Sequence, residues 1–245
     1  MSGHSKWASI KHKKAATDAK RGKLFTKLIK EITVAARRGG GDIDKNPSLR
    51  TAIDRAKQAN MPADNIDRAV KKGTGELEGV NYEEFTMEGY GPGGVAIMVE
   101  LLTDNRNRTT ADIRNIFSKK NGSLAGAGSV SWMFEKKGYL EVEKSSAPED
   151  KVMSVVLDAG AQDMETGDDS YFITTDPRDF EAVKKALEDN NIKTASAEIT
   201  MIPKNTIQLK GDDAKQILGI MEALEDHDDS QNVYANFDIP DDIVE

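Results

Sequence analysis

The sequence has no cysteine, and aromatic residues make up only 6% of its 245 residues. The absence of cysteine excludes disulfides, thiolate nucleophiles and cysteine-ligated zinc, and it agrees with a reducing compartment. No apolar run approaches the roughly 20 residues that a helix needs to span a bilayer, and the N-terminus lacks the apolar stretch of a secretory signal. We therefore expect a cytoplasmic protein that does not contact membranes.

Histidine is also scarce, with three residues in the chain. His4 and His12 lie among lysines, a setting that favours exposure or phosphate contact over metal ligation. His227 lies in the acidic segment 225–229, where a weak divalent-cation site is a minor alternative to a plain loop. Carboxylates are numerous but scattered, and no serine, histidine and aspartate follow a catalytic spacing. The sequence therefore predicts no enzyme, no cofactor, no metal and no small-molecule substrate.

Two glycine-rich stretches lack the features of a phosphate-binding loop. Residues 89–94 and 122–128 lead into strand-like sequence, and neither contains the Gly-Lys-Ser/Thr that cradles phosphates. The first stretch indicates a tight hairpin turn. The second, extended to Ser131, is longer than a turn requires, so a mobile binding loop and an unremarkable connection both remain open.

Positive and negative charges are concentrated in different parts of the chain, whose net charge is −8. Residues 1–72 hold 18 basic and 7 acidic side chains, a net charge of +11, whereas residues 73–245 hold 16 basic and 35 acidic ones, a net charge of −19. Extended duplex would repel the acidic body. We therefore expect contact with a polyanion to be led by the N-terminal part.

The first 40 residues contain eleven lysines and arginines against two acids. At 100° per residue, apolar residues between Leu24 and Ala36 share one arc and most of the basic residues fall opposite, which predicts a buried face and a basic face turned to solvent. Simple solvation is the alternative to phosphate binding, but repulsion within one helix face favours phosphate binding. The predicted nucleic-acid-binding residues in this segment are Lys6, Lys11, Lys13, Lys14, Lys20, Arg21, Lys23, Lys27, Lys30, Arg37 and Arg38.

Arg106 and Arg108 extend the predicted nucleic-acid-binding set. They lie in the polar stretch 104–110, between a strand end and a helix start, where a helix N-terminus attracts anions. Helix capping and ion pairs to nearby acids are the favoured alternative. Trp7 offers a similar choice between base stacking and, as is commoner for the single aromatic of an amphipathic helix, a core anchor.

The pattern of apolar residues and breakers predicts an α+β multidomain fold. Residues 1–79 should form a helical basic domain ending in a linker, with Asn46 and Pro47 starting one helix and Gly73 closing another. Strands are expected at 82–89, 95–103 and 130–134, and a capping box of Thr109 and Asp112 should begin the helix between the last two. Residues 138–203 follow the order βαββαβ of a ferredoxin-like unit. After it we expect a strand at 206–209, a helix at 214–224 and a strand at 233–237.

The elements on either side of the ferredoxin-like unit are too few to close separate sheets. We therefore predict one discontinuous α+β domain, residues 80–135 with 204–245, into which the ferredoxin-like α+β domain, residues 136–203, is inserted.

Several long motifs occur in a fixed order and resemble one family. The sequence contains GHSKWASIKHKKAATDAKRGKLFTKLIKEI, NPSLRTAIDRAKQANMP, KKGTGE, EGYGPGGVA, TDNRNRTT and ANFDIP. Together they resemble the YebC family over the whole chain. The resemblance implies a three-domain protein whose bacterial relatives are described as DNA-binding transcriptional regulators and whose mitochondrial relatives are described as translational activators. It supplies no catalytic residues.

We therefore expect a non-enzymatic, nucleic-acid-binding regulator of gene expression. DNA-binding transcriptional regulation is the first hypothesis. A ribosome-associated translation factor that binds RNA is the alternative, favoured by the acidic body and by the absence of a recognisable helix-turn-helix.

Overall fold

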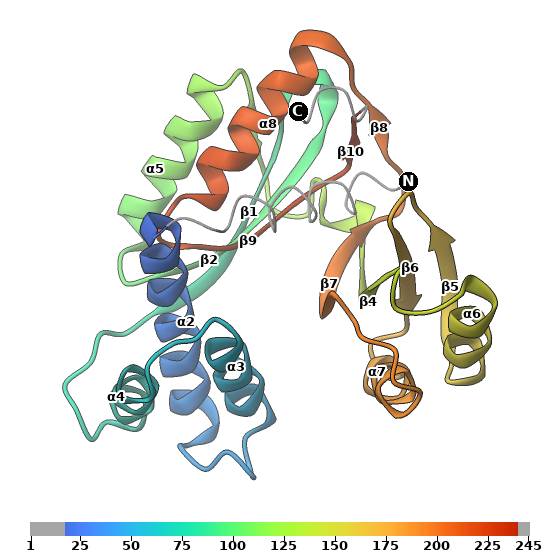
Figure 1. The fold of residues 1–245 in the computed structure, drawn as a ribbon. Helices are drawn as coiled ribbons and strands as arrows, with labels where there is room; N and C mark the ends of the chain where they lie inside the picture. Colours follow the sequence, from blue (N-terminus) through green and yellow to red (C-terminus); the bar gives the residue numbers. More distant parts are fainter. Residues whose placement is uncertain (1–17, 240–245) are drawn as a thin grey trace.

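The computed structural model describes the backbone of residues 18–239 and the side chains of residues 21–239. Figure 1 shows a helical part, formed by the earliest described residues, beside two α+β units, each with its own sheet. This arrangement confirms the predicted α+β multidomain fold.

Three helices form the N-terminal part: α2 (Asp18–Gly39), α3 (Pro47–Gln58) and α4 (Ala63–Thr74). The start of α3 is as predicted, because the Asn46 side chain accepts a hydrogen bond from the Leu49 N–H at 3.1 Å and Pro47 follows the cap. The Asn46 amide also donates to the carbonyl of Ala35 at 2.9 Å, which ties α3 to α2. Helix α4 continues past Gly73 and is closed by Gly75, whose φ of 85° is easy only for glycine. Leu28, Ile32, Leu49, Ile53 and Ile66 are among the buried residues of this helical core.

The first sheet has the strand order β3-β1-β2-β9 and is antiparallel throughout. Its strands are β1 (Glu83–Tyr90), β2 (Ala96–Thr103), β3 (Ser123–Ala125) and β9 (Ser230–Ala235). The predicted hairpin is confirmed, with a short helix η1 (Pro92–Gly94) as the turn between β1 and β2. A further pair, β8 (Ile207–Gln208) and β10 (Phe237–Asp238), runs parallel.

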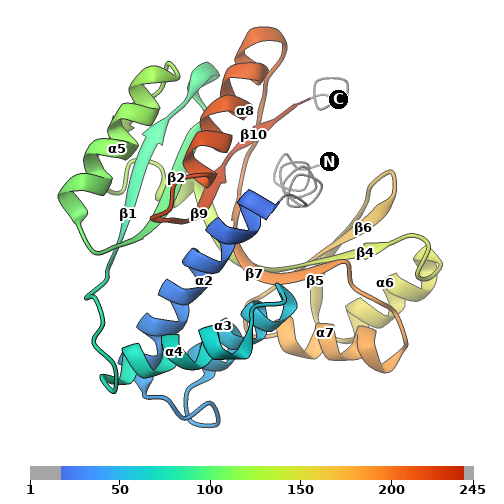
Figure 2. The same cartoon turned by 60° about the vertical axis from the view of Figure 1, so that its left-hand side comes forward.

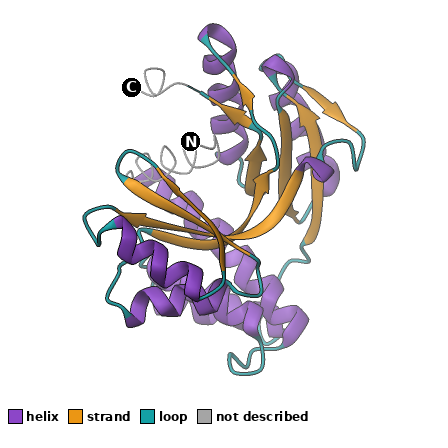
Figure 3. Ribbon diagram, turned by 90° about the vertical axis from the view of Figure 1, so that its right-hand side faces the viewer, coloured by secondary structure: helices purple, strands orange, loops and turns teal. Residues whose placement is uncertain are grey.

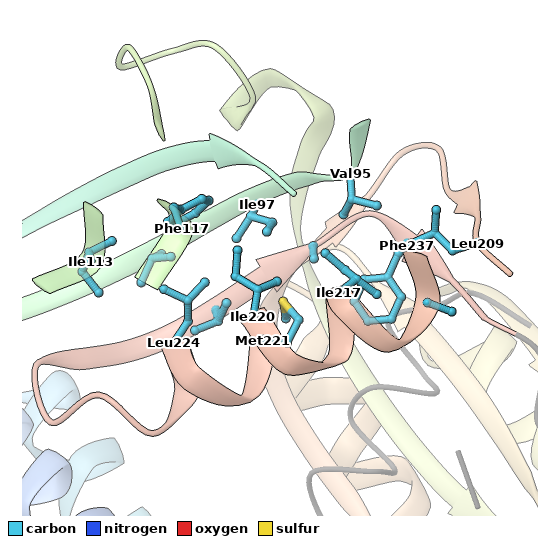
Figure 4. Close-up of a cluster of buried hydrophobic side chains, with 14 of the residues drawn as sticks. Val95, Ile97, Ile113, Phe117, Leu209, Ile217, Ile220, Met221, Leu224 and Phe237 are labelled. Atoms are coloured by element: carbon cyan, nitrogen blue, oxygen red, sulfur yellow. The ribbon is translucent and has the colours of Figure 1, made fainter. Parts of the chain in front are cut away.

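Two helices, α5 (Arg106–Lys119) and α8 (Gly211–Glu225), cover one face of the first sheet (Figures 1 and 2). Ile97, Phe117, Ile217, Leu224 and other apolar side chains from these elements interlock in the largest core (Figure 4). Because α8 and β9 come from the end of the chain and β1 and β2 from its middle, this core joins segments that the second unit separates. The discontinuous arrangement is therefore held together by apolar burial.

The second unit follows the predicted order βαββαβ. It comprises β4 (Phe134–Glu143), α6 (Glu149–Asp158), β5 (Ala161–Thr166), β6 (Ser170–Thr175), α7 (Phe180–Asp189) and β7 (Ser196–Pro203). The sheet order β5-β6-β4-β7, antiparallel throughout, is that of a ferredoxin-like fold. Both helices pack on one face of the sheet (Figure 3).

Several local predictions were wrong. Helix α5 begins at Arg106 under an Asn105 cap, whose side chain accepts from the Arg108 N–H at 3.1 Å, so Thr109 and Asp112 form no capping box. Asparagine at the strand end reaches a free N–H of the first turn, which makes a later cap unnecessary. Residues 131–133 form a short helix, η2, so the expected strand at 130–134 begins only at Phe134.

Candidate nucleic-acid interface

The basic face of α2 lies against the acidic loop, defined here as residues 225–229, and this corrects the expectation that the whole face is turned to solvent. Its lysine ammonium groups donate to main-chain carbonyls: Lys23 to Asp226 at 3.1 Å, Lys27 to Glu225 at 2.6 Å and Lys30 to Asp228 at 2.9 Å. The acidic loop begins at the C-terminal end of α8, where unpaired carbonyls and the helix dipole favour cations. The helical domain is thus attached to the first α+β unit through this face.

Lys30 is the most deeply placed of these lysines, with only 10% of its side chain exposed. Its ammonium group lies 2.6 Å from a carboxylate oxygen of Asp229, whose side chain is 6% exposed. A buried ammonium group with this partner has no free capacity for a phosphate. Lys30 is therefore a docking residue, in contrast to the prediction of an exposed phosphate contact.

Asp229 accepts hydrogen bonds from several elements at once. Its other carboxylate oxygen accepts hydrogen bonds from the hydroxyls of Thr103 at 3.0 Å and Thr109 at 2.6 Å and from the guanidinium of Arg108 at 3.0 Å. Burial alone would raise the pKa of Asp229, but the hydrogen bonds from Lys30, Thr109 and Arg108 hold that pKa well below its usual range. The acidic loop is therefore a structural junction, and no group of three or more metal-ligating side chains occurs in the described part of the chain.

Arg106 and Arg108 are engaged within the protein, as the capping and ion-pair alternative predicted. Arg106 forms an ion pair with Glu83 and stacks over the Phe85 ring, with its guanidinium carbon 4.4 Å from the ring centroid. Arg108 bridges Asp229 and Asp104, the latter at 2.8 Å, and these hydrogen bonds raise its pKa. About half of each arginine side chain stays exposed.

The remaining predicted residues of the basic segment fall into three groups. Arg37 donates to the side chain of Asn81 at 2.7 Å, and Arg38 forms an ion pair with Glu84 at 2.9 Å, so the end of α2 is held to the linker and β1. Arg21 is exposed, and its guanidinium carbon lies 5.8 Å from the centroid of the Phe25 ring. Lys6, Lys11, Lys13 and Lys14, together with Trp7, His4 and His12, lie outside the described residues, as does the side chain of Lys20.

A second group of cations was not among the predicted site residues. Lys57 on α3 and Arg68 and Lys72 on α4 are exposed, and no carboxylate of the described residues forms an ion pair with them. Arg68 and Lys72 are four positions apart, so they share one face of α4. The four-residue spacing of Arg68 and Lys72 can be read from the sequence. The sequence does not show which cations of this basic run stay unpaired, because the neighbouring Lys71 forms an ion pair with Asp67 at 2.7 Å.

The glycine-rich loop, residues 122–131, is anchored by a buried carboxylate. Glu88, 6% exposed, accepts hydrogen bonds from the N–H groups of Gly128 at 2.7 Å, Val130 at 2.6 Å and Ser131 at 3.0 Å. Burial would raise the pKa of Glu88, but these three donors outweigh it and lower the pKa. Sequence reasoning did not identify this anchor, because β1 is about 40 residues away from the loop along the chain.

An open cleft of about 1020 Å³ lies between α2 and α3, the strands β1 and β2, and the start of β7. Both signs of charge line it: the basic residues are Lys27, Arg38 and Arg55, and the acidic residues are Glu31, Glu84, Glu100 and Glu198. Within the lining, Arg55 pairs with Glu31 at 3.2 Å. This mixture provides no positive field for phosphates.

The described residues thus define a three-part α+β protein with a basic helical domain attached to an acidic body. Residues 5–76 match the family description "TACO1/YebC protein N-terminal domain", and residues 82–237 match "TACO1/YebC second and third domain". The chain belongs to the TACO1/YebC family, as the sequence motifs predicted.

Relatives and a solved structure agree over nearly the whole chain. A "Probable transcriptional regulatory protein" of Desulfatibacillum aliphaticivorans is 58% identical, with 100% of this chain and 99% of the relative covered. One of the same description from Desulforapulum autotrophicum is 60% identical, with the same coverage. A crystal structure of a conserved hypothetical protein from Aquifex aeolicus is 49% identical and matches with a TM-score of 0.86, covering 98% of this chain and 99% of its own. At the family level, the chain is a regulator of this type.

Proposed function

We propose that this protein is a non-enzymatic regulator of gene expression that binds nucleic acid through its N-terminal domain, with DNA as the first target. The observation that carries the proposal is the charge separation, +11 in residues 1–72 against −19 in the rest. An acidic body approaching a polyanion is oriented by its basic end. The name shared by the relatives, which describes transcriptional regulation, supports the same conclusion.

The phosphate contacts are assigned to cations that the fold leaves open. Lys23, Lys27 and Lys30 hold the helical domain on the body, so we assign them an orienting role. The contacting groups are then Arg21, Lys57, Arg68 and Lys72, which are exposed, together with the basic residues before Asp18. Each contact releases condensed counterions, which drives association without reading a sequence.

Salt dependence tests this assignment. Changing Arg68 and Lys72 together to Gln removes two exposed charges, and the slope of log affinity against log salt should fall by up to about 1.8 on duplex. A second variant, with Lys11, Lys13 and Lys14 changed to Gln, should lower the slope by up to about 2.7. The matched control is Lys151 and Lys193 changed to Gln, because both are exposed on the second α+β unit. An unchanged slope in both test variants would contradict the proposal.

Binding of RNA on the ribosome, as a translation factor, remains the second candidate, and one feature of α4 favours it. The turn between α3 and α4 is four residues long, as in a helix-turn-helix, but the first turns of α4 carry exposed Asp64 and Asp67. A recognition helix places these positions in the major groove beside phosphates, where carboxylates are repelled. Sedimentation of lysate at low and moderate salt separates the candidates, since the protein should travel either with the nucleoid or with ribosomes.

A further inference from the structure

Trp132 is the most exposed large hydrophobic residue in the described part of the chain, with 64% of its surface accessible. One exposed apolar side chain is ordinary on a protein surface and by itself indicates no function. Trp132 differs because its own loop holds the ring in place and because two exposed lysines lie near it, Lys136 along the chain and Lys204 beside its loop.

The indole ring is fixed by its own loop. Its N–H donates to the Ser129 carbonyl at 3.0 Å, and the same carbonyl accepts the Tyr90 hydroxyl at 3.3 Å. Trp132 is also the middle residue of η2, so its backbone is constrained. Because the polar atom of the ring is already bonded inside the protein, the accessible part of Trp132 is hydrocarbon surface.

The loop that carries the ring is itself anchored. Glu88 binds three of its N–H groups, and Val130, fully buried, packs with Ala96, Phe134 and Tyr234 in a small apolar cluster. Strand β4 starts directly after η2 and belongs to the second sheet, whereas Ala96 and Tyr234 belong to the first. The ring is therefore presented from a rigid junction between the two sheets, and ordering it on binding costs little entropy.

Two lysines lie close to Trp132. Of the charged residues that follow it in the chain, Glu135 and Lys137 pair with each other at 3.7 Å, which leaves Lys136. Lys204 is exposed, and its N–H donates to the Met133 carbonyl at 2.9 Å, which places it beside Trp132. Lys136 is exposed four residues after Trp132. Neither lysine forms an ion pair with a carboxylate among residues 21–239.

We propose that Trp132 is a stacking platform for an unpaired base of a single-stranded nucleic acid, with Lys136 and Lys204 attracting the adjacent phosphates. This inference rests on the proposed function and adds a second contact surface far along the chain from the N-terminal domain. Aromatic rings with nearby cations bind single strands without sequence preference, because every base has a stacking face. A proline-rich peptide would also cover an exposed tryptophan, but it has no phosphates for the two lysines.

The test compares wild-type protein with Trp132→Ala and Trp132→Phe on a twelve-nucleotide oligouridine and on a twelve-base-pair duplex. Trp132→Ala should weaken oligouridine binding about 5- to 150-fold, the range measured for loss of base stacking, while Trp132→Phe retains most of the affinity. Duplex affinity and Tm should be unchanged in both variants, because duplex bases are already stacked and the ring is exposed. Lys136→Gln and Lys204→Gln should each lower the single-strand salt slope by about 0.7, with Lys151→Gln as the control.

Fluorescence supplies an independent measurement. The chain has two tryptophans, so Trp7→Phe leaves Trp132 as the only reporter, and stacking of oligouridine should quench its emission. Unchanged oligouridine affinity in Trp132→Ala, with the wild-type salt slope intact, would overturn the platform and leave the proposed function standing. Quenching by oligoproline and not by oligouridine would overturn it in favour of a peptide. Failure of the wild-type protein to bind any nucleic acid would overturn both proposals.

Discussion

Helices α2 and α4 both carry cations at helical spacing, yet the fold uses the two basic faces differently. On α2, Lys23, Lys27 and Lys30 donate to the acidic loop, whereas on α4 Arg68 and Lys72 are exposed without an acidic partner among the described residues. Similar sequence patterns thus give one docking face and one open face. A cluster of lysines therefore identifies a binding surface only after the protein's own carbonyls and carboxylates have been located.

Separating the helical domain from the acidic body should have the largest effect on the difference between the α2 and α4 faces. Residues 1–79 expressed alone should fold around the helical core and lose the acidic loop, so the α2 face becomes as open as that of α4. The duplex salt slope should then rise by up to about 2.7 relative to the whole chain, for three freed lysines. Cooperative thermal unfolding must be shown first. A folded fragment with the whole-chain slope would contradict the docking interpretation.

Expressing further fragments tests the predicted domain boundaries. Residues 136–203 should fold alone, because a βαββαβ unit closes its own core, and should show no duplex binding. Residues 80–135 alone should not unfold cooperatively, since their sheet lacks β9 and their core lacks α8. The opposite result for the two fragments would refute the insertion boundaries.

Removing the partner of Lys30 should have the next largest effect. Asp229→Ala removes the carboxylate that a buried ammonium group and two threonine hydroxyls share, and breaking a buried pair in this way costs about 3–5 kcal/mol. Urea unfolding of the variant measures the loss. Asp226→Ala, at an exposed carboxylate 3.6 Å from Lys23, should cost under about 1 kcal/mol. Equal losses would show that burial of the Lys30 pair is unimportant.

The apolar side of α2 also contains one buried and one exposed position. Leu28 is 6% exposed and Leu24 is 43% exposed, although the helical wheel places both on the buried arc. Leu28→Ala should cost about 2–5 kcal/mol through a cavity. Leu24→Ala should cost under about 1 kcal/mol. Thermal unfolding of both variants decides whether the arc is buried at both positions.

Lowering the pH should weaken the contacts between the α2 face and the acidic loop before it affects the exposed face of α4. The folded-state pKa of Asp229 is depressed, so its contribution to stability is present above the unfolded value of about 3.9 and is lost as the pH falls through the folded-state pKa. Stability measured from pH 6 to pH 2 should therefore fall more steeply for the wild type than for Asp229→Asn. Parallel curves would contradict this account.

The smallest effect is expected at the open face itself. Arg68→Gln and Lys72→Gln should each change the free energy of unfolding by less than about 0.5 kcal/mol, because neither makes an ion pair with a described residue. Lys30→Gln, at the docked face, should cost several times more. A large loss in the α4 variants would show that this face also supports the fold.

Most of the elements could be predicted because their signals are local. Asn46 with Pro47, the glycines of the β1–β2 turn and the βαββαβ order each act within a few residues, and the structure confirms all three. The start of α5 was missed because Asn105 and Thr109 are both good caps. In the structure Asn105 is the cap, and the Thr109 hydroxyl instead donates to Asp229, 120 residues away.

Local patterns predicted most of the helices and strands and the separation of charge between the N-terminal residues and the rest of the chain, whereas the assignment of residues 136–203 as an inserted domain stays a prediction. Periodicity, caps and composition are properties of neighbouring residues, so they need no knowledge of the fold. Which cations are available depends on the tertiary fold, because Lys30 is paired with Asp229 from 199 residues away. The glycine-rich loop is likewise anchored by Glu88 over a long separation along the chain. Long-range ion pairs and hydrogen bonds of this kind depend on where the apolar cores bring the chain together, and the helical wheel of a single segment cannot contain that information.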